Sequence, residues 1–140
     1  MADRVIRAAL ASLAVVGLSS GLWAEFSPRS FYDEFPGGGR AWVAANGPYN
    51  EHLVRDFGAL NLALTVVTVV ALVTLGRAVV VAAGLAWIAF SVPHLVYHAR
   101  HLDVFDTSDQ VAAMAALVLG VVLPTIVLVA ELRRPTVSPG

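Results

Sequence analysis

The chain has 140 residues, about the length of one domain, and its composition is that of a membrane protein. Hydrophobic residues make up 58% and charged residues 14% of it, against roughly 45–50% and 25% in soluble domains. The formal net charge of -1 gives no argument for nucleic-acid binding. Cysteine is absent, which excludes disulfides, thiolate catalysis and iron–sulfur clusters.

Four apolar segments are each long enough to form a membrane-spanning helix. They cover residues 5–23, 54–75, 78–98 and 111–132. About 20 helical residues cross a hydrocarbon core of about 30 Å, and only helices or closed barrels satisfy the backbone there. The sequence therefore predicts a single all-α domain over residues 1–140, a four-helix transmembrane bundle.

The first segment could instead be a cleaved signal peptide. Arg4 and Arg7 precede the apolar stretch, and Ala24 could end it. However, Leu22-Trp23-Ala24 is a poor small-x-small cleavage site, which favours a retained helix.

Residues 25–50 are expected to form a long, structured outer loop. Ser27-Pro28 is typical of a helix N-cap followed by proline in the first turn, and it predicts a short helix that breaks before Gly37. The loop is rich in aromatic residues: Phe26, Phe31, Tyr32, Phe35, Trp42 and Tyr49. Because Trp and Tyr favour the headgroup level, the loop should lie over the outer helix ends as a lid, or form a belt that only anchors the chain.

The charges beside the spans predict the orientation. With both termini on one side, that side carries five arginines and two acidic residues, whereas the other carries four arginines and eight acidic residues. Cytoplasmic loops carry the excess of basic residues. We therefore expect a multi-pass protein of the cell membrane with both termini in the cytoplasm.

Two polar patterns concern the second and fourth spans. Asn61, Thr65 and Thr68 share one face of the second span, which is typical of helix–helix hydrogen bonding. Residues 107–110 match a capping box and predict that the fourth helix starts there.

Most residues capable of chemistry lie in two short stretches. His94, His98 and His101 end the third span, and His52 and Asp56 open the second. Helical residues are about 100° apart, so the three histidines share one face if the helix continues to His101. His94 and His101 would lie about 10 Å apart along the axis, so one metal ion could take only two of the three.

Membrane topology places the two stretches at similar depth. We expect His52 beside His98 or His101 near the outer surface, and Asp56 beside His94 one turn deeper. This arrangement predicts a site between the second and third helices.

Four further residues could support that site. Glu51 and Arg55 have the i,i+4 spacing that favours an ion pair. Arg55 and Tyr97 could orient an anionic or carbonyl-bearing substrate. Asp103, like Asp56, could be a metal ligand or fix the tautomer of a histidine.

The residue types suggest which cofactor would bind. Imidazole and carboxylate ligands without cysteine suit Zn, Fe or Cu(II). A bis-histidine haem between His52 and His98 is a narrower alternative, because it needs a ring-sized gap between the helices. The leading hypothesis is thus an outward-facing metal or redox-cofactor site that acts on a lipid-soluble substrate. The alternative is that the histidines lie at the level of the lipid headgroups and form no binding site. Placing an ionisable group near the membrane interface costs little free energy.

The layout of four short helices, a long loop after the first and a tight turn at Gly76-Arg77 resembles small bacterial DoxX-like membrane proteins. The lysine-free composition, rich in Ala, Val and Arg, is similar to that of actinobacterial proteins. The resemblance implies membrane redox work, either quinone-linked oxidation or a subunit role in a membrane complex, and it assigns no residue a role.

Two other functions stay open at this level. One is a non-catalytic accessory or scaffold subunit. The other is a small proton-linked transporter, since histidine titrates near physiological pH. In each case the expected partners are the lipid bilayer and a further copy of the chain or another membrane subunit.

Overall fold

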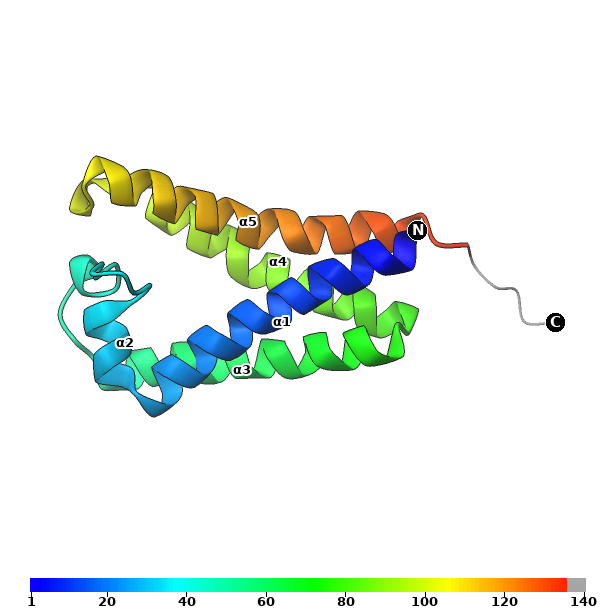
Figure 1. The fold of residues 1–140 in the computed structure, drawn as a ribbon, viewed down its shortest axis with the longest axis horizontal. Coiled ribbons are helices and arrows are strands. Elements are labelled where there is room, and N and C mark those ends of the chain that lie inside the picture. Colours follow the sequence, from blue (N-terminus) through cyan, green and yellow to red (C-terminus); the bar gives the residue numbers. More distant parts are fainter. Residues whose placement is uncertain (136–140) are drawn as a thin grey trace.

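The computed structural model describes residues 1–135, which contain helices and no strand. The helices are α1 (Ala2–Phe26), α2 (Pro28–Glu34), α3 (Glu51–Thr74), α4 (Arg77–Ala99) and α5 (Thr107–Leu132), with 3-10 turns η1 (Ala44–Asn46) and η2 (Leu102–Val104). The short helix α2 lies at the end of the molecule away from the N-terminus (Figure 1). We call this end, which also holds the α4–α5 connection, the α2 end.

The four long helices confirm the four predicted apolar segments. Each is long and apolar enough to cross a membrane, with a mean hydropathy between 1.8 and 2.6. Each begins before its apolar stretch, and a polar side chain caps the start of two of them, α3 and α5. For example, α3 begins at Glu51, where the Asn50 side chain accepts a hydrogen bond from the Leu53 backbone N–H at 3.2 Å.

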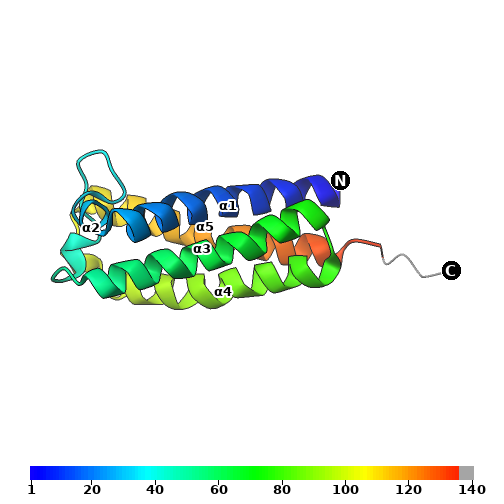
Figure 2. The same cartoon turned by 90° about the horizontal axis from the view of Figure 1, so that it is seen from below.

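The long helices form a closed ring in which each has two neighbours. α1 packs against α3 and α5, and α4 packs against the same two helices. α1 crosses the bundle diagonally, from α5 near its own N-terminus to α3 near its C-terminus (Figures 1 and 2). The diagonal path separates α1 from α5 toward the α2 end.

Two apolar clusters hold the ring together. The larger one lies in the half nearer the termini, and its fully buried members include Ile6, Leu10, Val80 and Val127. The smaller one centres on Phe31, which joins α2 to Ala24 of α1 and Val54 of α3. The predicted short helix after Ser27 is confirmed, with proline in its first turn.

Charged residues join the elements at the terminal end of the bundle. Arg134 pairs with Glu131 of α5 at 2.8 Å and with Asp3 of α1 at 3.0 Å. It also donates to the Leu75 carbonyl of the α3–α4 turn at 3.0 Å. The Glu131 side chain is only 1% exposed. One guanidinium group therefore links three elements that are distant in the sequence.

α4 ends and α5 begins close to the expected positions, but two details at these ends differ from the expectation. α4 ends at Ala99, so His101 lies past the helix with a φ of -132° and does not share the face of His94 and His98. The cap of α5 is Asp106, whose carboxylate accepts from the Asp109 N–H at 2.9 Å. The helix therefore begins at Thr107, and residues 107–110 are not a capping box headed by Thr107.

Candidate functional site: an apolar cavity with a histidine pair

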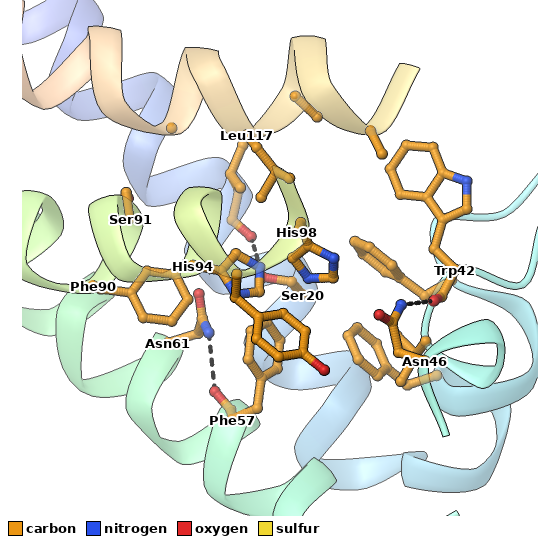
Figure 3. A pocket seen from close by; sticks show the side chains of 18 of the residues that line it. Ser20, Trp42, Asn46, Phe57, Asn61, Phe90, Ser91, His94, His98 and Leu117 are labelled. Carbon is orange, nitrogen blue, oxygen red and sulfur yellow. Dashed lines mark hydrogen bonds between the residues drawn. The ribbon is translucent and has the colours of Figure 1, made fainter. Parts of the chain in front are cut away.

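A partly open cavity of about 430 Å³ lies between the four long helices toward the α2 end. Its lining comes from α1, α3, α4, α5 and the segment between α1 and α3 (Figure 3). Eight of the 21 lining residues are aromatic: Phe31, Phe35, Trp42, Phe57, Trp87, Phe90, Tyr97 and Phe105. Its polar members are Ser19, Ser20, Asn46, Asn61, Ser91, His94 and His98. An apolar cavity of this size with a few polar groups is typical of small-molecule sites.

His94 and His98 lie side by side on the cavity wall. Their i,i+4 spacing on α4 brings the ring centroids to 4.7 Å, with the planes at 81°. The His94 ring stacks on Phe90 at 5.3 Å, and the His98 ring lies 6.5 Å from Phe105. Aromatic contacts on both sides therefore hold the two imidazoles in place.

Two buried nitrogens in the cavity lining have no hydrogen-bond partner among residues 1–135. They are Nδ1 of His98 and Nε1 of Trp42. A buried polar group without a partner costs free energy, so such groups are uncommon in folded proteins. A ligand oxygen that reached the His98 nitrogen would remove that cost.

The segment between α1 and α3 supplies one side of the cavity. Phe35 and Trp42 line it, and their rings lie 6.2 Å apart. The same segment is attached to the start of α5, because Arg40 pairs with Asp109 at 3.0 Å and Trp42 meets Phe105 at 6.4 Å. These contacts hold the segment against the α2 end of the cavity.

The residues expected from the second span lie elsewhere. His52 pairs with Asp56 of its own helix at 2.8 Å, and the two side chains are 80% and 61% exposed. The predicted ion pair between Glu51 and Arg55 is confirmed at 2.8 Å, and Arg55 also donates to the Glu25 carbonyl. None of these four α3 side chains lines the cavity.

The remaining expected residues lie around the end of α4. Tyr97 lines the cavity and stacks on His101 at a centroid distance of 4.3 Å. His101 also donates from Nδ1 to the Tyr97 carbonyl at 2.7 Å. Asp103 lies in η2 and is exposed. Of the nine residues expected at the site, the structure thus brings His94, Tyr97 and His98 to the cavity.

A metal centre lacks a third ligand in this arrangement. Among residues 1–135, no group of three or more His, Asp or Glu side chains is placed to hold a metal ion. His94 and His98 provide two neighbouring imidazoles. The metal or haem site that was expected to join His52 and Asp56 to these histidines stays a prediction.

The cavity is also lined by residues that the sequence patterns did not point to. Asn61 was expected only to bond between helices, and Ser91 and Phe90 were read as parts of an apolar span. Of the polar stripe on α3, Thr68 forms the expected interhelical bond, because it accepts from Trp87 Nε1 at 2.8 Å. Asn61 lies one turn before Thr65 on the same face of α3, which marks it as a member of the polar stripe. Whether its amide faces a cavity depends on how α4 packs against α3.

No known family model, curated protein or solved structure matches the chain. The resemblance to DoxX-like proteins therefore stays a prediction.

Proposed function

We propose that the chain is a multi-pass membrane protein that binds a lipid-soluble molecule with an oxygen-bearing aromatic ring in the cavity. His94 and His98 would contact the oxygen of that ring. The observation that carries the proposal is the unpartnered Nδ1 of His98 in an apolar cavity that eight aromatic side chains line. The quinol form of a redox-active quinone is such a ring, and the quinone form is flat and carries its oxygens at the same positions.

The lining supports this ligand class in two ways. Flat aromatic side chains such as Phe90 and Phe105 offer stacking and edge contacts to a ring. A neutral imidazole has one donor and one acceptor nitrogen, so the histidine pair could bind either a carbonyl or a hydroxyl oxygen. A strongly charged ligand fits poorly, because no Arg, Asp or Glu lines the cavity.

Tryptophan fluorescence provides a direct test. Trp42 and Trp87 line the cavity and Trp23 does not, so a quinone in the cavity should quench part of the emission. With decylubiquinone as the probe and the protein in lipid nanodiscs, we expect saturable quenching. Loss of a hydrogen bond in His94→Ala or His98→Ala should raise the Kd by about three- to tenfold.

His52→Ala is the matched control, since His52 is an exposed histidine that does not line the cavity. It should leave the Kd unchanged. Quenching that rises linearly without saturation, or an equal loss of affinity in His52→Ala, would contradict the proposal. An accessory or scaffold subunit would show the first of these results.

A metal site is the second candidate, favoured by the 4.7 Å spacing of the His94 and His98 rings. It needs further ligands from the bound molecule or from solvent, since Zn sites have four ligands. Metal analysis of purified wild type and His98→Ala tests it. Absence of Zn, Fe and Cu in wild type would contradict the metal site without affecting the proposal that the cavity binds an oxygen-bearing ring.

We also propose that the cavity faces the outer side of the cell membrane, with both termini in the cytoplasm. The absence of native cysteine makes labelling simple. A membrane-impermeant thiol reagent should label Ser27→Cys in intact cells and Arg77→Cys only after permeabilisation. The opposite pattern would reverse the orientation.

A further inference from the structure

Asn61 presents an unused hydrogen-bond acceptor to the cavity. Its side chain is 2% exposed and lines the cavity from the middle of α3. The amide nitrogen donates to the Phe57 carbonyl at 2.9 Å. Figure 3 shows the nitrogen on that bond and the amide oxygen pointing the other way, into the cavity.

The orientation of this amide follows from its partner. The Phe57 carbonyl can only accept, so the Asn61 group that faces it must be the NH₂. The oxygen is then fixed on the cavity side, where it accepts no hydrogen bond from the described residues. Turning the amide over would place its oxygen against the Phe57 carbonyl oxygen, and two acceptors repel each other. The amide oxygen of Asn61 therefore stays on the cavity side.

Ser91 adds a free hydroxyl on α4. It is 6% exposed and lines the same cavity. Buried hydroxyls on α3, those of Thr65 and Thr68, donate to a carbonyl one turn back in their helix at 2.7 Å. The Ser91 hydroxyl makes no such bond within the described residues. It faces Gly120 of α5, where the absence of a side chain leaves room in front of it.

Both groups lie deep in the bundle. Asn61 is ten residues from the start of α3, which is about 15 Å along the helix axis. An amide oxygen without a protein partner on the wall of an apolar cavity favours a ligand donor that reaches it.

We infer that the inner end of the cavity selects ligands that carry a ring hydroxyl, which donates to the amide oxygen of Asn61 and contacts the Ser91 hydroxyl. This inference rests on the proposed function and narrows its ligand class. The cavity takes a phenol or quinol in preference to a molecule of the same shape that has no donor. Asn61 and Ser91 are specificity-determining residues, and the histidine pair binds the other end of the ligand.

Two competitors that differ by one donor test the inference. 4-Decylphenol and 4-decylanisole have the same ring and chain, but only the phenol has a hydroxyl donor. Each is titrated against decylubiquinone quenching in nanodiscs. We expect wild type to prefer the phenol, and Asn61→Leu to reduce that preference by about tenfold, the value of one hydrogen bond. Comparing wild type with the variant cancels the different partitioning of the probes into lipid.

Two more variants keep the test independent of folding defects. Ser91→Ala removes only a hydroxyl and should reduce the preference for the phenol by a smaller factor. Thr65→Val removes a buried hydroxyl that already donates within α3 and does not line the cavity. This matched control should keep the wild-type preference.

The possible outcomes separate the two proposals. Equal competition by phenol and anisole in wild type, or a preference unchanged in both Asn61→Leu and Ser91→Ala, overturns the inference while the proposed function stands. A preference lost equally in Thr65→Val also overturns it. Failure of wild type to show saturable decylubiquinone quenching overturns the proposed function, and the inference with it.

Discussion

Gly58 lies where α3 comes closest to α1. A Cβ atom at this position would lie 2.7 Å from the backbone nitrogen of Glu25 and 3.1 Å from the carbonyl carbon of Ala24. Side-chain rotation cannot relieve contacts with backbone atoms. The close approach of the two helices therefore depends on glycine at this position.

Gly58→Ala should lower the free energy of unfolding by about 1–3 kcal/mol, the usual cost of overpacking. The clash should outweigh the gain in helix propensity, about 0.5–1 kcal/mol when Gly becomes Ala in a helix. Equilibrium unfolding in detergent micelles measures the change. Gly76→Ala is the control, because its nearest contact would be an ordinary 3.7 Å to Thr74. Equal stability of Gly58→Ala and wild type would show that α1 and α3 can separate freely.

Residue types predicted part of the site. The i,i+4 spacing of His94 and His98 predicted neighbouring rings, since helix geometry alone fixes that relation. The role of Asn61 could not be predicted in the same way. Whether its amide bonds to another helix or faces a cavity depends on the packing of α4 and α5, which the sequence of α3 does not contain.

Caps decide where the helices start. Hydropathy located the four apolar spans, but it could not locate the polar residues that extend them. α5 starts at Thr107, four residues before the apolar stretch, because the Asp106 carboxylate accepts from the Asp109 N–H at 2.9 Å. The sequence pattern pointed to Thr107 as the cap, and only the backbone geometry shows that Asp106 is the capping residue.

The Asp106 cap should make the start of α5 sensitive to acid. The backbone N–H of Asp109 and then the Ser108 hydroxyl hold the pKa of the Asp106 carboxyl below its usual value. Since the folded-state pKa is lowered, the cap contributes stability above the unfolded pKa of about 3.9. That contribution is lost as the pH falls through the folded pKa.

NMR of the Asp109 amide in micelles measures this effect. The amide shift should titrate with a midpoint below about 3.9, the usual aspartate value. Asp106→Asn should remove the part of the titration that comes from the Asp106 carboxyl, while keeping a side-chain oxygen that caps the helix. A midpoint at or above the ordinary value would mean that the carboxylate does not bond to the N–H.

The cavity is a property of the whole bundle. It lies where α1 departs from α5 on its diagonal path, so residues from all four long helices line it (Figure 1). The sequence predicted the four helices because each has its own apolar stretch. It could not predict the crossing of α1, which results from contacts such as Gly58 with Glu25. The expected site between the second and third spans therefore omitted the α1 and α5 walls.

The terminal end of the bundle is held by one arginine. Arg134 pairs with the buried Glu131 and with Asp3, and it also bonds to the Leu75 carbonyl. Removing the arginine leaves the Glu131 carboxylate, 1% exposed, without its cation. Breaking a buried pair in this way costs about 3–5 kcal/mol, far more than the loss of a surface pair.

Arg134→Met should therefore lower the free energy of unfolding in micelles by about 3 kcal/mol, a loss at the lower end of that range because Arg134 is partly exposed. The neighbouring, exposed Arg133 is the matched control, and Arg133→Met should change stability by less than about 0.5 kcal/mol. Adding Glu131→Leu to Arg134→Met should restore much of the loss, since no unpaired charge is then buried. If the double variant is less stable than Arg134→Met, the Glu131 carboxylate is not the source of the cost. In that case the bonds of Arg134 to Asp3 and Leu75 would account for the stability of this end.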